Sequence, residues 1–372
     1  MRDAELSMRP GHVWGLSAGG FHRMAYVAWG REGETAKRPV ICVHGLTRNA
    51  RDFDRLAAAL STDRHVVCPD VVGRGQSDWL ADPAGYGYAQ YCADMAVLIA
   101  RLGRDEVDWV GTSMGGLIGM TLAAQSNSPI RRLILNDVGP FIPARALRRL
   151  GGYVGQDPRF DNLAGLEAYL RQTHATFGAL DDAAWRHLAV HGHRRLPDGR
   201  WGLAYDPAIG RGFAAATVMD IDLSPLWQKV QCPVLVLRGT ESDLLLAQTA
   251  RTMAAKATVV DIPAVGHAPS LMVPAQIEEV ARARPHIGAI LAAGEAMEQN
   301  HERACTLCFR GMQHAKQRVA AAVRHGELEA FARDIAELRP MRQDRIADSL
   351  QIGTPPGGAA AKRRKGQSCA SH

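Results

Sequence analysis

The chain has 372 residues, of which 47% are hydrophobic and 22% are charged. This composition predicts a packed core and excludes a chain that is disordered throughout. The net charge of +6 comes from scattered basic residues and one C-terminal run, Lys362–Lys365, which we interpret as a solvated tail. No basic stripe interleaved with aromatic residues is present, so nucleic acid is not an expected partner.

Seven cysteines occur, an odd number without the spacing of a small disulfide scaffold. Cys42, Cys68 and Cys232 lie in or beside apolar runs, and we interpret these three as buried reduced thiols. Residues 1–10 lack the apolar segment of a signal peptide. No run approaches the roughly 18 apolar residues of a membrane-spanning helix. We therefore expect a cytoplasmic protein without a membrane partner, and the sequence leaves its oligomeric state open.

Short apolar runs alternate with amphipathic segments from residue 22 onward. Strands are predicted at 22–29, 39–43, 65–69, 106–110, 130–135, 234–237 and 257–262. Helices are predicted at 50–60, 88–102, 114–125, 246–256 and 274–283. This alternation predicts an α/β fold in which helices cover both faces of a mostly parallel sheet.

The alternation is interrupted between two predicted strands, and this interruption defines the expected domains. Residues 1–139 and 225–285 are predicted to form the two parts of one α/β core. Residues 140–224 are too long for a loop and are predicted to form a helical cap. Residues 286–352 are predicted to form a helical extension and residues 353–372 a disordered tail.

The segment Gly111–Gly115 matches the pattern Gly-x-Ser-x-Gly between a predicted strand and a predicted helix. In that setting the turn is so tight that side chains two residues before or after the serine would collide with the backbone, which explains Gly111 and Gly115. Ser113 is thereby exposed at the sheet edge, and we predict that it is a nucleophile.

A serine hydroxyl needs a base, and the base needs an acid that orients it. His267 follows the last predicted strand and is the predicted base. The acid is expected after the strand at 234–237, where Asp243 and Glu241 both qualify, and Asp243 is favoured because it lies farther into the loop. Asp137, after the preceding strand, is a third candidate, for which a strand-end cap is the favoured interpretation.

The oxyanion that forms during attack needs backbone N–H donors. Met114, directly after the nucleophile, is the predicted first donor. Leu46, in the loop after an early strand, is the predicted second, and Gly45 allows the close approach of the backbone there.

Four segments together resemble the α/β-hydrolase superfamily: His44-Gly45, Asp70–Ser77, Gly111–Gly115 and Gly266–Pro269. They occur in that family's order, and the resemblance covers roughly residues 20–283. It implies an eight-stranded, mostly parallel sheet and cofactor-free hydrolysis through an acyl-enzyme. More narrowly, the chain is similar to the capped bacterial esterases and carbon–carbon hydrolases. Proteins of this family normally end soon after the histidine, whereas this chain continues.

The predicted substrate is a small or medium carboxylic ester, held in an apolar pocket lined by Phe141, Trp185 and Trp201. A carbon–carbon or enol-lactone hydrolase is the competing enzyme hypothesis. Such an enzyme would need polar groups of the cap for a substrate carboxylate, for which the sequence offers Arg145, Arg148, Arg149 and His191. Two further hypotheses for the same fold are a non-catalytic ligand-binding protein and an acyltransferase. The group His301, Cys305, Cys308 and His314 lacks zinc-finger spacing, so no metal and no cofactor are expected.

Overall fold

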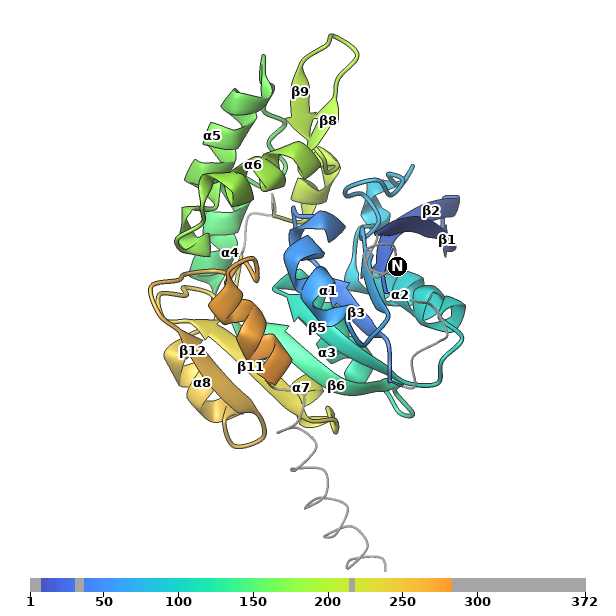
Figure 1. Ribbon diagram of the computed structural model, residues 1–372, viewed down its shortest axis with the longest axis vertical. Coiled ribbons are helices and arrows are strands. Elements are labelled where there is room, and N and C mark those ends of the chain that lie inside the picture. The colour runs from blue at the N-terminus through green and yellow to red at the C-terminus, as the bar shows by residue number, and fades with distance from the viewer. Residues whose placement is uncertain (1–7, 31–36, 214–217, 283–372) are drawn as a thin grey trace, which may run out of the picture. The chain divides into compact units, whose positions relative to one another are not determined.

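An eight-stranded sheet forms the centre of the structure (Figure 1), with the strand order β1-β2-β4-β3-β5-β6-β11-β12. β1 pairs with β2, and β2 with β4, in antiparallel fashion, whereas all pairs from β4 to β12 are parallel. The mostly parallel sheet predicted from the sequence is therefore confirmed. Its strands are β1 (Arg9–Ser17), β2 (Gly20–Trp29), β3 (Val40–Val43), β4 (Val66–Pro69), β5 (Val107–Thr112), β6 (Ile130–Asn136), β11 (Val234–Gly239) and β12 (Thr258–Ile262).

This computed structural model describes residues 8–30, 37–213 and 218–282. They belong to one unit, Met1–Glu295. The predicted extension at 286–352, the predicted tail at 353–372 and the group from His301 to His314 lie outside the described residues.

Strand β1 is absent from the sequence prediction. It is the edge strand of the sheet and buries few apolar side chains: Trp14 and Leu16 are 58% and 61% exposed, whereas Val13 is buried. Pro10, Gly11 and Gly15 also lower its strand propensity. An edge strand of this composition lacks the buried apolar run by which the central strands are recognised.

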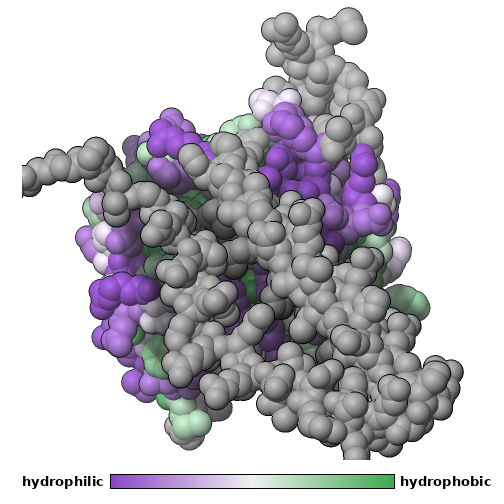
Figure 2. All heavy atoms as spheres, turned by 90° about the horizontal axis from the view of Figure 1, so that it is seen from below, coloured by the Kyte–Doolittle hydropathy of each residue, from purple (hydrophilic) through white to green (hydrophobic). Residues whose placement is uncertain are grey.

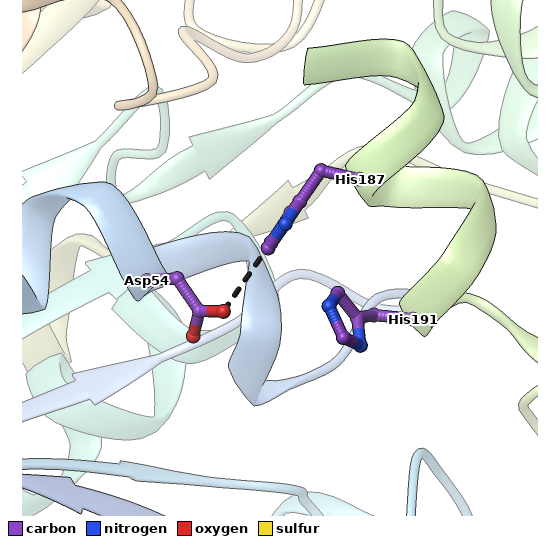
Figure 3. A group of neighbouring side chains, drawn as sticks. All are labelled: Asp54, His187 and His191. Carbon is purple, nitrogen blue, oxygen red and sulfur yellow. Dashed lines mark ion pairs between the residues drawn. The ribbon is translucent and has the colours of Figure 1, made fainter. Parts of the chain in front are cut away.

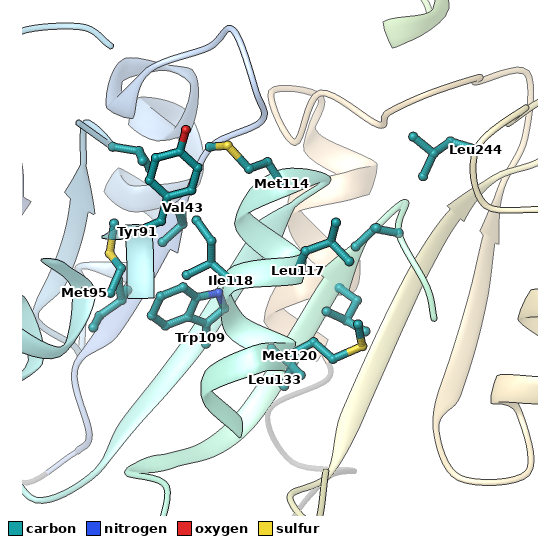
Figure 4. Close-up of a cluster of buried hydrophobic side chains, with 14 of the residues drawn as sticks. Val43, Tyr91, Met95, Trp109, Met114, Leu117, Ile118, Met120, Leu133 and Leu244 are labelled. Carbon is teal, nitrogen blue, oxygen red and sulfur yellow. The ribbon is translucent and has the colours of Figure 1, made fainter. Parts of the chain in front are cut away.

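The parallel strands bury both faces because their side chains alternate between two hydrophobic clusters. Ile41 and Val43 of β3 belong to the larger cluster, and Cys42 belongs to the smaller one. Figure 4 shows part of the larger cluster, with side chains of α3 packed around Trp109. Helices α2 (Tyr88–Arg101), α3 (Met114–Ala123), α7 (Ser224–Gln228) and α8 (Ala247–Met253) contribute to the larger cluster, and α1 (Asp54–Leu60) and the helical residues 274–282 to the smaller one.

The segment between β6 and β11 forms the cap that stands beside the sheet in Figure 1. β7 (Phe141–Ile142) and β10 (Ile221–Asp222) pair where the segment leaves and rejoins the core. Between them lie α4 (Ala144–Gly151), α5 (Leu163–Thr173), α6 (Asp182–His191) and the hairpin of β8 (His193–Arg195) and β9 (Trp201–Leu203). The cap therefore contains the expected helices and, in addition, two short strand pairs that were not predicted from the sequence. Among the described residues, the short 3-10 helices are η1 (Ala50–Phe53), η2 (Pro83–Gly85), η3 (Ala175–Phe177) and η4 (Pro207–Phe213).

The surface seen in Figure 2 is predominantly hydrophilic where the described residues are visible, with small separate hydrophobic areas. Among the described residues, no helix is long and apolar enough to cross a membrane.

Candidate active site

Ser113 lies in a tight turn between β5 and α3, with a φ of 51° that is unusual for a residue other than glycine. The two glycines of the motif are sterically required there. A Cβ atom at Gly111 would overlap the carbonyl oxygen of Gly115, and one at Gly115 would overlap that of Val43. The turn therefore presents the serine hydroxyl at the carboxyl edge of the sheet.

A continuous chain of hydrogen bonds joins Ser113, His267 and Asp137. The Ser113 Oγ lies 2.9 Å from His267 Nε2, and His267 Nδ1 lies 2.8 Å from Asp137 Oδ2. An ionised carboxylate can only accept a hydrogen bond, so His267 Nδ1 carries the proton and donates it. The lone pair on Nε2 then faces the serine hydroxyl. This is the arrangement that a serine nucleophile and its base require.

Asp137 follows β6 directly and has a φ of 55°. Its side chain is fully buried, and besides His267 it accepts hydrogen bonds from the Gly239 N–H and the Ser242 hydroxyl, at 2.9 and 2.6 Å. The neighbouring Asn136 donates to the Pro269 carbonyl at 2.8 Å, which ties the loop of His267 to the end of β6. Asp137 is thus held in place as an acceptor and is more than a strand-end cap.

The prediction that Asp243 is the acid beside His267 is wrong. Its carboxylate is paired with both Arg149 Nε and Nη2 at 2.6 and 2.8 Å, and Arg149 comes from cap helix α4. Although burial alone would raise the pKa of Asp243, the guanidinium holds it below its usual value. Glu241, the other candidate of this loop, has an exposed side chain. The ends of β6 and β11 are neighbours in the sheet, so both aspartates reach this edge and only the local backbone decides between them.

The predicted oxyanion donors flank the nucleophile. A methyl group at Gly45 would lie only 3.8 Å from Ser113 Cβ, so the loop before Leu46 passes directly beside the serine. His44 shapes this loop, with Nδ1 2.7 Å from the Gly45 carbonyl and Nε2 accepting from the Val71 N–H at 2.9 Å. Complete burial lowers the pKa of His44 to about 3, which keeps the ring neutral in this role.

A buried arginine, which was not predicted from the sequence, connects the two predicted donors. Arg74 is 0% exposed; it donates to the Leu46 carbonyl at 2.9 Å, and its Nη2 lies 3.6 Å from the Met114 sulfur. It also donates to the Val72 carbonyl and the Tyr91 hydroxyl. None of these four contacts involves a carboxylate, and the guanidinium also lies over the rings of Tyr86 and Tyr91, so its positive charge is held beside the Leu46 carbonyl and the Met114 side chain.

A cavity under the cap adjoins the loop after Leu46. Arg48, Tyr153, Tyr169, His174 and Tyr205 contribute to its lining. Burial lowers the pKa of His174 to about 3, with Arg48 and His267 contributing in the same direction, so this lining histidine is neutral.

The lining of this cavity differs from the predicted pocket of Phe141, Trp185 and Trp201. Trp185 is 6% exposed and belongs to the larger hydrophobic cluster. Of the cap groups considered for a carboxylate, Arg145 and Arg148 are exposed, and Arg149 is paired with Asp243. Three tyrosines therefore line this cavity, where tryptophans were expected.

The sheet, the nucleophile turn and the cap define an α/β hydrolase, and the chain belongs to the α/β-hydrolase fold family, whose model matches residues 38–271. A 3-hydroxybutyrate-oligomer hydrolase from Cupriavidus necator is 47% identical over 282 residues, which are 73% of this chain and 96% of that protein. A 2-(acetamidomethylene)succinate hydrolase from Mesorhizobium japonicum is 31% identical over 229 residues, covering 60% of this chain and 79% of that protein.

Among solved structures, an α/β hydrolase from Novosphingobium aromaticivorans is 37% identical, with a TM-score of 0.66 and coverage of 75% of this chain and 97% of that one. Family and relatives agree that the chain is an enzyme of the hydrolase class.

Proposed function

We propose that this hydrolase cleaves carboxylic esters through an acyl-enzyme, with Ser113 as nucleophile, His267 as base and Asp137 as the orienting acid. The observation that carries the proposal is the unbroken hydrogen-bond chain of 2.9 and 2.8 Å through these three side chains. The proton on His267 Nδ1 is fixed by Asp137, so Nε2 is free to remove the serine proton.

In the proposed reaction, Ser113 Oγ attacks the ester carbonyl while its proton moves to His267 Nε2. The N–H groups of Leu46 and Met114 hold the oxyanion, and each such donor contributes about 3 kcal/mol to lowering the barrier in comparable enzymes. His267 then protonates the leaving alcohol. A water molecule, activated by the same histidine, attacks the acyl-enzyme and releases the acid.

For the substrate we propose short oligoesters of 3-hydroxybutyrate. The support is the relative of that activity, because 96% of its length aligns with this chain at 47% identity. Such an oligomer ends in a hydroxyl group and a carboxylate, which are polar ends on an otherwise apolar chain.

The test compares the intact chain with Ser113→Ala on two substrates, the 3-hydroxybutyrate dimer and p-nitrophenyl butyrate. We expect the intact chain to hydrolyse both and to take a fluorophosphonate label, and Ser113→Ala to lose all three signals with an unchanged melting temperature. If the chain hydrolyses p-nitrophenyl butyrate but not the 3-hydroxybutyrate dimer, the proposed substrate is refuted and the proposed ester hydrolysis stands. A folded chain that neither hydrolyses an ester nor takes the label would refute the whole proposal.

A further inference from the structure

A second group of side chains with metal-ligand chemistry lies where the cap meets the core, apart from the candidate active site. It consists of Asp54, the first residue of α1, and His187 and His191 of cap helix α6 (Figure 3). One potential ligand atom from each residue lies within 4.8 Å of the other two. Two imidazole nitrogens and one carboxylate oxygen are ligands that Zn²⁺, Co²⁺ and Ni²⁺ favour.

The geometry of α6 favours a shared ligand. Residues four apart on a helix lie on the same face, so His187 and His191 both project toward α1. His187 Nε2 lies 3.4 Å from Asp54 Oδ2, and the Asp54 side chain is only 11% exposed. The Asp54 carboxylate and the His187 imidazole are therefore already about as far apart as two ligands of the same metal ion.

In this structure, Arg51 connects Asp54 and His191. Its guanidinium contacts Asp54 Oδ2 at 2.6 Å, and its Nη1 lies 3.3 Å from His191 Nδ1. Because the arginine can only donate, His191 Nδ1 must offer its lone pair toward the centre of the group. The backbone carbonyl of Arg51 lies 2.8 Å from His187 Nε2 and accepts its hydrogen bond. A metal ion would have to displace this guanidinium and the proton on His187 Nε2.

We propose that Asp54, His187 and His191 form a binding site for one divalent transition-metal ion, with Arg51 as the cation that the ion replaces. The Arg51 side chain is 26% exposed, so it has a route into solvent when the ion enters. The proton on His187 moves to Nδ1, which frees Nε2 as a ligand, and water completes the coordination shell. A doubly charged ion then balances the carboxylate in place of a singly charged arginine.

Such an ion would tie the cap to the segment after the oxyanion loop. Asn49, three residues after Leu46, already donates to the His191 carbonyl at 2.9 Å. Helix α6 belongs to the cap and Asp54 to the core, so the ion joins elements that are otherwise connected by hydrogen bonds and packing. Its binding is therefore expected to raise the melting temperature of the full chain.

In the experiment, the full chain without an affinity tag is titrated with CoCl₂. The heat of binding and the visible absorption of the bound cobalt are measured. We expect one saturable site, and a loss of affinity of at least about tenfold in His187→Ala and in His191→Ala, since each removes one ligand. The matched control is His12→Ala, which removes an exposed histidine of β1 outside the group and should bind as the intact chain does. Arg51→Gln removes the competing cation and should tighten binding several-fold.

Three results would overturn the proposal. The first is the absence of saturable cobalt binding to the folded chain. The second is binding that persists in both histidine variants and disappears in Cys305→Ser or Cys308→Ser, accompanied by thiolate-to-cobalt absorption, which would assign the ion to the cysteines outside the described residues. The third is weaker binding by Arg51→Gln at an unchanged melting temperature, because the arginine would then support the site instead of competing for it.

Discussion

Replacement of Asp137 by asparagine tests the proposed triad most directly. The carboxylate accepts from His267, Gly239 and Ser242, whereas an amide of the same shape keeps one acceptor oxygen and presents an N–H₂ group in place of the other. If that N–H₂ group faces His267, the imidazole must accept at Nδ1 and carry its proton on Nε2. The histidine then presents a proton to Ser113 and cannot act as its base.

We expect Asp137→Asn to lower kcat by about 10,000-fold, as an imposed wrong tautomer does in serine proteases. That loss corresponds to about 5.4 kcal/mol of transition-state stabilisation. The fold should survive, because asparagine fits the volume that Asp137 occupies.

Asp243→Asn is the matched control, because it makes the same chemical change in the neighbouring loop. Asp243 and Arg149 are 34% and 36% exposed, and ion pairs of this kind contribute about 0–1 kcal/mol. Hydrolysis should therefore fall by less than about tenfold.

The assay is kcat and KM for p-nitrophenyl butyrate, together with the rate of fluorophosphonate labelling and the melting temperature. A larger loss in Asp243→Asn than in Asp137→Asn, with both variants folded, would refute the assignment and return the role to Asp243.

Three further predictions concern the surroundings of the site. Arg74→Lys keeps a positive charge, but a lysine cannot reach four acceptors at once. We therefore expect steady-state kinetics to show a kcat lower by about 10- to 100-fold with little change in KM. An unchanged kcat would show that Arg74 does not position the oxyanion donors. Gly115→Ala places a methyl group against the Val43 carbonyl and should lower the free energy of unfolding by about 1–3 kcal/mol in urea denaturation, whereas a neutral effect would contradict the steric argument. The pKa of His174 is lowered to about 3 in the folded chain, so the unfolded chain binds more protons between pH 3 and about 6.5, and stability falls as the pH falls through that window. His174→Gln should flatten this dependence by about 1.4 kcal/mol per pH unit near pH 5, as urea titrations at several pH values would detect, and an unchanged slope would show that another group carries it.

Local rules were sufficient to predict most of the core and two members of the candidate triad. The central strands are buried on both faces, so their apolar runs stand out, whereas edge strand β1 buries Val13 but exposes Trp14 and Leu16. Ser113 was predictable because the turn permits only glycine at Gly111 and Gly115. His267 was predictable because a late histidine follows the last strand of the sheet.

The acid could not be chosen by such rules. Asp137 and Asp243 follow adjacent parallel strands, and either position satisfies the requirement of an acid at the same sheet edge. The choice depends on the backbone of Asp137, which turns its side chain toward the Gly239 N–H and the Ser242 hydroxyl. It also depends on Arg149, which comes from the cap and is distant in sequence from both loops.

The two aspartates at this sheet edge therefore have different partners. Asp137 has no exposed surface and accepts hydrogen bonds from His267, Gly239 and Ser242. Asp243 remains partly exposed and binds cap helix α4 through Arg149. A change in the cap that displaces Arg149 would leave the Asp243 carboxylate without its partner. The cap is thus connected to the loop of Asp243 through Arg149, whereas the hydrogen bonds of the proposed triad come from the core.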